Sequence, residues 1–322
     1  MSLHHIWPVK IPSIEGAPHA FPYQGSKRGL AHAIVPLLPA DTATLVEPFC
    51  GSAAVSIAAL HSGAAKAAHI RDLNAPLVDL WRAIIEDAGA LADQYEFIWK
   101  LGADDPVGTF AKIRDRFNAD HSPADLLYLL NRIVKAAIRY NGSGQMNQGA
   151  DKRRLGAKPA LTRTRLTTTG RLLAGRVLVS AGDYADLLHA AEPDDVVYMD
   201  PPYQGTSGTR DGRYLGGLAR EDFVAELRIA VNAGASFLVS YDGSTGGRTY
   251  GEDLPVDLGL LHVHLHAGVS TQATLSGVDE QTIESLYISA ALVDRLGGSS
   301  AVVGRLMEPS TAPSQAGQVL LR

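Results

Sequence analysis

A carboxylate, two prolines and an aromatic ring stand in a row at Asp200-Pro201-Pro202-Tyr203, directly after the apolar run Val196–Met199. Proline donates no hydrogen bond to a sheet and fixes its own φ, so the chain leaves the predicted strand rigidly at this point. The loop then offers carboxylate and carbonyl acceptors together with a ring for stacking. These groups suit a site that holds a flat heterocycle by its amino group. The alternative is a plain proline-rich turn.

A second motif supplies the other half of such a site. Residues 42–46 read as a short strand that runs into Glu47 and a turn containing Gly51, and residues 53–60 have the small, apolar character of a buried helix. Strand, tight turn and helix start together hold nucleotide-like ligands close to the backbone. The next predicted strand ends at Asp72, where an acid can accept hydrogen bonds from ribose hydroxyls. The glycine fingerprint is incomplete, but the two motifs together indicate a nucleotide site.

In this order, the motifs resemble those of the DNA adenine methyltransferase (Dam-like) family of adenine-N6 enzymes. The likeness runs from about residue 21 to residue 292. Two departures bear on cofactor affinity, since Ser52 stands where a second glycine is common and Met146 where a phenylalanine is usual. The segments that carry the resemblance are Phe21–Lys27, Val46–Gly51, Asn131–Arg132, Arg139–Asn147, Gly182–Tyr184 and Asp200–Tyr203.

The resemblance implies S-adenosylmethionine (SAM) as the methyl donor. It places Asp72 on the ribose and Asp183 on the exocyclic amine of the SAM adenine. Tyr23 and Phe49 are alternatively core aromatics, and Asp183 is alternatively a helix cap. The full implied cofactor-binding set is Tyr23, Lys27, Glu47, Phe49, Gly51, Asp72 and Asp183.

The reaction that fits these residues is methylation of an amino nitrogen. Adenine N6 is a poor nucleophile because its lone pair is delocalised into the ring. Acceptance of the two amino hydrogens by Asp200 and the Pro201 carbonyl would localise that lone pair, and Tyr203 would stack on the base. A base inside a duplex cannot reach this loop, so the adenine must be flipped out. The predicted catalytic set is Asp200, Pro201, Pro202 and Tyr203.

Basic residues concentrate between positions 131 and 176. This stretch holds eleven lysines and arginines against one aspartate, a net charge of +10, and because the whole chain carries −5 the remainder carries −15. Interleaved amide and hydroxyl side chains could read base edges while the cations contact phosphates, whereas the plain alternative is a solvated face. We predict contacts with double-stranded DNA from Arg132, Arg139, Asn141, Asn147, Lys152, Arg153 and Arg154.

The composition is typical of a cytoplasmic enzyme. The 322 residues are 46% hydrophobic, and the single cysteine excludes a disulfide framework. The N-terminus lacks the apolar core of a signal peptide, and no apolar run reaches membrane-spanning length. Three alternating histidines, His262, His264 and His266, lack a cysteine or carboxylate partner, so we expect an ordinary strand face and no metal.

Strand-like runs that alternate with helical ones, among them predicted helices over residues 75–86 and 125–138, predict an α/β fold with a parallel-rich sheet covered on both faces. The resemblance implies a Rossmann-like, seven-stranded SAM-dependent methyltransferase sheet whose last strand is reversed. We expect residues 21–90 and 174–294 to form this catalytic domain. Residues 91–173 are expected to form an inserted, mostly helical DNA-recognition region, and residues 295–322 a flexible tail.

Alternatives remain open at this level. Other amino acceptors are cytosine N4, RNA adenine and a protein glutamine amide, although the basic stretch favours nucleic acid. A non-catalytic DNA-binding module would keep the same fold, and a dinucleotide-dependent oxidoreductase leaves Asp200–Tyr203 unexplained. The resemblance allows a cognate restriction endonuclease as a partner, and we expect a monomer or weak dimer.

Overall fold

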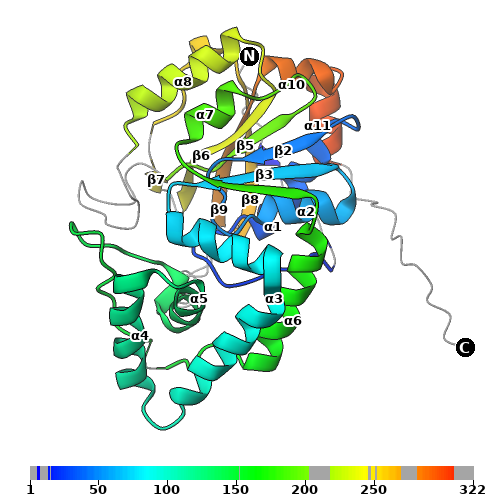
Figure 1. Cartoon of the computed structure of the whole chain (residues 1–322). Coiled ribbons are helices and arrows are strands. Elements are labelled where there is room, and N and C mark those ends of the chain that lie inside the picture. Colours follow the sequence, from blue (N-terminus) through cyan, green and yellow to red (C-terminus); the bar gives the residue numbers. More distant parts are fainter. Residues whose placement is uncertain are drawn as a thin grey trace, which may run out of the picture.

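The structure is a computed structural model that describes residues 6–7, 14, 16–151, 153–202, 218–245, 248–250, 252–269 and 281–307. These residues form one nine-stranded sheet in the order β1-β8-β9-β6-β5-β2-β3-β4, with β7 paired to β6 (Figure 1). The strands are β1 Ile6–Trp7, β2 Thr44–Glu47, β3 Ala67–Asp72, β4 Val177–Ala181, β5 Val196–Met199, β6 Phe237–Thr245, β7 Arg248–Tyr250, β8 Leu261–Val269 and β9 Gln281–Ile288.

Seven longer strands within the described residues confirm the predicted sheet, and β1 and β7 are short additions at its margins. Strand β9 runs antiparallel to both of its neighbours, β6 and β8, as expected of a reversed last strand. The pairs formed by β2, β3, β4, β5 and β6 are parallel. Parallel strands bring their carboxyl ends to one edge of the sheet, where Glu47 ends β2, Asp72 ends β3 and Asp200 follows β5.

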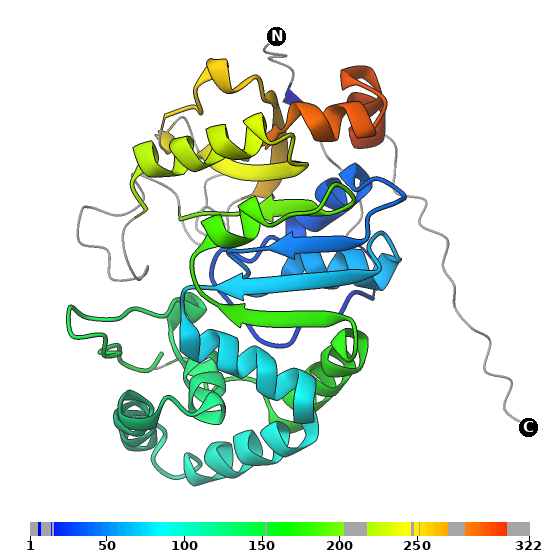
Figure 2. The same ribbon diagram turned by 45° about the horizontal axis from the view of Figure 1, so that its top comes forward.

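Helices cover both faces of the sheet, because its central strands are apolar on both sides (Figure 2). Leu45 and Val196 pack on the face covered by α1, α2, α10 and α11. Val46 and Val197 point to the opposite face, where α7 and α8 lie. The helices are α1 Arg28–Ile34, α2 Ala54–Ser62, α3 Ala75–Leu101, α4 Pro106–Asp120, α5 Pro123–Arg132, α6 Pro159–Leu173, α7 Tyr184–His189, α8 Arg220–Asn232, α10 Ala290–Arg295 and α11 Ser299–Met307.

The segment between β3 and β4 forms a helical lobe at one edge of the sheet (Figures 1 and 2). It consists of α3, α4, α5 and α6, and the described residues of 91–173 contain only one isolated bridge, between Tyr140 and Met146. The sequence predicts a helix that ends at residue 86. In the structure the helix kinks at Asp87, whose side chain accepts a hydrogen bond from the Ala90 N–H at 2.8 Å, and then continues. The expected domain boundary at residue 91 therefore lies inside α3.

Two expectations about local structure are wrong. Residues 125–138 were expected to form one helix, but α5 ends at Arg132, and Lys135 and Ala136 adopt left-handed φ values of 59° and 51°. The expected flexible tail begins too early, because residues 299–307 form α11, with Val302 and Leu306 buried against the sheet. Residues 308–322 lie outside the described part of the chain. None of the described helices combines the length and apolarity needed to cross a membrane.

Candidate active site

Asp200 lies at the end of β5 and forms an ion pair with Lys27. The Lys27 Nζ atom is 2.9 Å from Asp200 Oδ1, and the two side chains are only 9% and 18% exposed. Lys27 immediately precedes α1, whereas the sequence assigned it to the cofactor. The structure thus brings this lysine to the predicted catalytic carboxylate and fixes how that carboxylate points. Pro201 is buried and Pro202 half-buried beside it, and Tyr203 lies outside the described residues.

Glu47 lies on the neighbouring strand β2, with its carboxyl group buried. Its Oε2 atom accepts hydrogen bonds from the Ser56 N–H at 3.0 Å and from the Ser56 hydroxyl. Burial, reinforced by the negative charge of Asp200, raises the pKa of Glu47 to about 7 against the pull of the Ser56 hydrogen bonds. A cationic ligand at this edge would favour the ionised form of Glu47, which suits a cofactor that carries positive charge.

Replacement of Glu47 by glutamine should stabilise the protein above pH 7. The pKa is about 7 in the folded chain and near its ordinary 4.5 in the unfolded one. Between these values the folded chain binds more protons, so the free energy of unfolding falls as pH rises. The variant should therefore gain about 1–3 kcal/mol over the original at pH 8 and nothing at pH 4. Urea unfolding at both pH values measures this gain, and a pH-independent difference would contradict it.

The turn after β2 is tied to the end of β3. The Gly51 N–H donates to Asp72 Oδ2 at 3.0 Å, and the Asn74 N–H donates to Asp72 Oδ1 at 2.9 Å. Burial raises the pKa of Asp72, and these hydrogen bonds oppose the rise. Gly51 has a φ of +45°, and a Cβ there would lie 3.0 Å from the Tyr23 ring, so glycine is required. The Trp81 indole fixes the same turn by donating to the Gly51 carbonyl at 2.9 Å.

The remaining predicted cofactor residues lie around the same edge. Phe49 stacks on Tyr184, with ring centroids 5.0 Å apart. Asp183 caps α7 by accepting a hydrogen bond from the Ala185 N–H at 2.9 Å, as its alternative interpretation foresaw, and it remains exposed. The acids Glu47, Asp72 and Asp183 at this edge suit a cationic nucleoside. The residues present therefore fit an adenosyl cofactor with a positively charged tail.

The predicted DNA-contacting residues divide between surface and interior. Arg139, Asn147, Arg153 and Arg154 are exposed. Asn141 is also exposed, but its side-chain oxygen accepts the Ser143 and Gln145 N–H groups and so shapes a tight turn. Lys152 lies outside the described residues.

Arg132 is a correction to the predicted DNA-contacting set. The residue is buried, and its guanidinium donates to the Pro106 carbonyl at 3.3 Å and the Leu155 carbonyl at 3.5 Å. Arg176, counted in the same basic stretch, likewise donates to three backbone carbonyls near the end of α2. Both arginines therefore hold backbone segments together, Arg132 in the interior and Arg176 half-buried. The sequence shows their charge but does not show how far each side chain is buried.

Sequence reasoning also missed a hydrogen bond between the segment after β3, which holds the Gly51 turn, and the loop after α5, which carries the exposed basic residues. The Tyr140 hydroxyl donates to the Asn74 side-chain oxygen at 3.2 Å, and both residues are buried. Asn74 follows Asp72 by two positions, and Tyr140 begins the exposed turn at Asn141–Gln145. No signal in the sequence pairs these two residues, because they are 66 positions apart.

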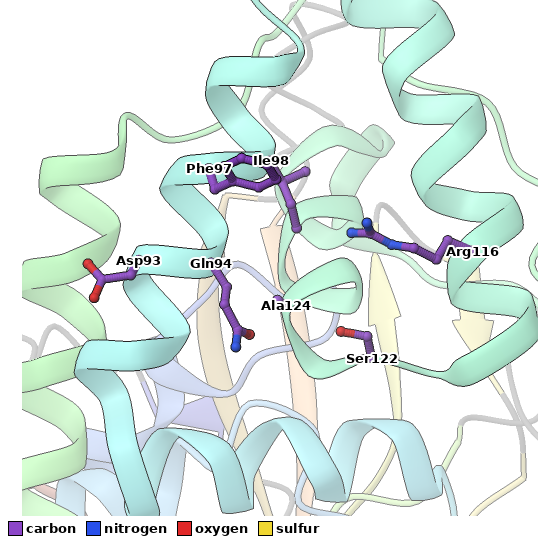
Figure 3. Close-up of a pocket in the computed structure, with 7 residues that line it drawn as sticks. All are labelled: Asp93, Gln94, Phe97, Ile98, Arg116, Ser122 and Ala124. Atoms are coloured by element: carbon purple, nitrogen blue, oxygen red, sulfur yellow. The ribbon is translucent and has the colours of Figure 1, made fainter.

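A pocket of about 470 Å³ lies elsewhere, between α3, α4 and α5 (Figure 3). Arg116 on its wall forms an ion pair with Asp125, which is completely buried. None of the motif residues lines this pocket, so it has no place in the site described above. The lining residues are Asp93, Gln94, Phe97, Ile98, Arg116, Ser122 and Ala124.

Comparison with known proteins agrees with this geometry. The model of the D12 class N6 adenine-specific DNA methyltransferases matches residues 23–263. The DNA N-6-adenine-methyltransferase of Escherichia phage P1 is 26% identical over 72% of this chain and 31% of its own length. The retron Ec67 DNA adenine methylase of Escherichia coli is 26% identical over 62% of the chain and 67% of its own. The type II methyltransferase M.FokI of Planomicrobium okeanokoites is 25% identical over 58% of the chain and 29% of its own.

The chain thus spans less than a third of the phage P1 and M.FokI proteins and about two thirds of the retron protein. The family match covers both motif-bearing strand ends and the helical lobe between them. It confirms the resemblance that the motifs indicated. The chain belongs to the D12 class N6 adenine-specific DNA methyltransferase family.

Proposed function

We propose that this protein transfers the methyl group of SAM to N6 of adenine in double-stranded DNA, within a fixed sequence context. The observation that carries the proposal is the convergence of Asp200, Glu47 and Asp72 at the carboxyl edge of adjacent parallel strands. In open α/β sheets this edge is where nucleotide-like ligands bind. The family membership supplies the reaction class.

In this proposal each side of the site has one task. The Asp200 carboxylate and the Pro201 carbonyl accept hydrogen bonds from the amino group of the target base, which localises the nitrogen lone pair, and the proton that N6 loses on methylation leaves by way of Asp200 to solvent. Lys27 holds the carboxylate through its 2.9 Å ion pair, so Asp200 needs little reorientation when the base arrives. SAM supplies a methyl group already activated by its sulfonium. Glu47, Gly51, Asp72 and Asp183 would hold SAM at the same edge of the sheet, beside the target base.

The proposed DNA surface is the loop between α5 and α6 that carries the exposed basic residues. Arg153 and Arg154 stand on it with their side chains in solvent, and the hairpin-like turn at Asn141–Gln145 projects beside it. The Arg154 side chain is 77% exposed and its Nε atom lies 3.8 Å from Asp151 Oδ2, a separation that leaves the guanidinium available to a phosphate. The likeness to M.FokI supports the further proposal that a cognate restriction endonuclease accompanies the protein.

Changing Arg153 and Arg154 together to alanine should weaken DNA binding and flatten its salt dependence. Each phosphate contact contributes about −0.9 to the slope of log K against log salt, so the slope should become shallower by about 1–2. Fluorescence anisotropy with a labelled duplex at several salt concentrations measures it. The matched control replaces Arg228 and Arg305, exposed arginines of α8 and α11, and should keep the original slope. An unchanged slope in the first variant would remove this loop from the interface.

The test of the function is single-molecule modification sequencing of DNA from a methylation-deficient host that expresses the chain. N6-methyladenine in one sequence context is the expected result. Methylcytosine in its place would move the activity to cytosine N4. Absence of any modified base, with the protein shown to be folded and SAM-bound, would refute methylation of DNA.

A further inference from the structure

The last two residues of β3, Arg71 and Asp72, hold the two loops beside the candidate cofactor site, one after β2 and one after β4. On one side, the Cys50 N–H donates to the Arg71 carbonyl at 2.8 Å, and the Gly51 N–H donates to Asp72. On the other side, the Gly182 N–H donates to the Asp72 carbonyl at 3.2 Å. The end of β3 therefore sets the separation between the two loops.

The Arg71 side chain adds a second connection, directed to the end of β4 and to the segment that follows it. Its Nε donates to the Ser180 hydroxyl at 2.9 Å, and its Nη1 donates to the Asp183 carbonyl at 2.8 Å. The same Nη1 lies 3.3 Å from Asp186 Oδ2, whose side chain is 76% exposed. A planar guanidinium presents its donors in a rigid fork, so the hydrogen bond to Ser180 of β4 orients the guanidinium and the one to the Asp183 carbonyl holds the loop against it.

The backbone of this loop is shaped to lie over the guanidinium. Gly182 has a φ of +144°, a conformation that side chains rarely adopt, and a Cβ there would lie 3.6 Å from Arg71 Cζ. The next residue, Asp183, accepts the Arg71 hydrogen bond at its backbone carbonyl, and its carboxylate takes no part in that contact. One carboxylate oxygen accepts the Ala185 N–H, which orients the group at the start of α7.

We propose that Arg71 is a positioning residue for recognition of the cofactor's adenine. By holding the Asp183 backbone, it places the Asp183 carboxylate against the exocyclic amine of the adenosyl group. This inference rests on the proposed function, because it assumes an adenosyl cofactor at this edge. The Arg71 carbonyl, which supports the Gly51 turn, is a backbone group and survives any side-chain change. Loss of the Arg71 side chain should therefore weaken only the part of the ligand affinity that comes from the adenine amine.

The test compares two ligands on the full chain by calorimetry. One is S-adenosylhomocysteine, and the other is its 6-deamino analogue, in which hydrogen replaces the amine. The original protein should prefer the amine-bearing ligand about tenfold, the size expected of one hydrogen bond to a charged group. In Arg71→Met this preference should fall to about twofold or less, with affinity for the deamino analogue nearly unchanged. Arg71→Lys should lie between the two.

Two variants serve as controls. Asp186→Ala removes the exposed partner of Arg71 but leaves its contacts with Ser180 and Asp183, so the preference should persist. Arg82→Met removes another β4-facing arginine, which donates weakly to the Val179 carbonyl at 3.5 Å, and should also keep the preference. Asp183→Ala should abolish it.

Three results would overturn the proposal, and they are distinguishable. Equal weakening of both ligands in Arg71→Met would make Arg71 a general structural residue. Equal affinity of the original protein for both ligands would remove Asp183 from amine recognition. Binding of neither ligand by the original protein would refute the adenosyl cofactor itself, and with it the proposed function.

Discussion

Replacement of Asp200 by alanine is expected to lower the rate of methyl transfer by about 10²- to 10³-fold, the usual effect of removing one electrostatic partner of a reacting group. The carboxylate stands at the end of β5, in an ion pair with Lys27. Without it the target amine loses one of its two acceptors, while the loops that hold the cofactor remain. Transfer of labelled methyl to DNA measures the rate, and calorimetry should find SAM affinity within a few fold of the original.

Asp194 provides the matched control for this variant. It is an exposed acid just before the same strand, at the edge opposite the motif residues. Asp194→Ala should retain full activity, which would exclude a general effect of lost negative charge on β5. Asp200→Asn keeps one oxygen acceptor and should lose less activity than Asp200→Ala. Turnover by Asp200→Ala at the original rate would refute the proposed chemistry.

Replacement of Gly170 by alanine should destabilise the protein by about 1–3 kcal/mol, the usual cost of overpacking a tight contact. Gly170 lies on α6 where that helix crosses α3, and a Cβ there would approach the Ile84 carbonyl oxygen to 2.5 Å. Because the oxygen belongs to the backbone of α3, relief requires the helices to separate. Urea unfolding measures the loss.

Gly304 in α11 supplies the comparison, because a Cβ there meets nothing within 4 Å. Gly304→Ala should be neutral or stabilising by up to about 1 kcal/mol, since alanine is the better helix former. If Gly170→Ala unfolded at the same urea concentration as the original protein, the close approach of α3 and α6 would be refuted.

The strand ends were predictable because a buried strand bounded by an acid leaves a plain signal. Glu47 and Asp200 follow apolar runs, Asp72 follows a short strand-like run, and the structure brings all three to one edge as parallel pairing requires. The kink in α3 was half visible, since the predicted helix ended one residue before Asp87. The sequence pattern did not show that the Ala90 N–H would donate a hydrogen bond to the Asp87 side chain, which restarts the helix.

Other features depend on tertiary contacts that no local pattern carries. Arg132 is charged, as surface residues usually are, yet it is buried in the lobe because its guanidinium donates to two backbone carbonyls from distant segments. The helix α11 was obscured by glycine and serine at its start, although Val302 and Leu306 have the four-residue spacing of a buried helix face. The Lys27–Asp200 and Tyr140–Asn74 contacts join residues far apart in the chain.

Strands β3 and β4 are neighbours in the sheet, paired from Ala68–Val177 to Asp72–Ala181. The whole helical lobe therefore leaves the sheet after Asp72, at the carboxyl edge, and enters the neighbouring strand at Val177, at the opposite edge, as one enlarged crossover. In evolutionary terms, such a lobe is an exchangeable cassette, because its two junctions stay fixed while its length and surface vary. Under the proposed function, the lobe could change its preference for DNA sequence while the strand ends that carry the motifs stay the same. For engineering, a lobe transplanted from a relative needs to match only the junctions after Asp72 and before Val177.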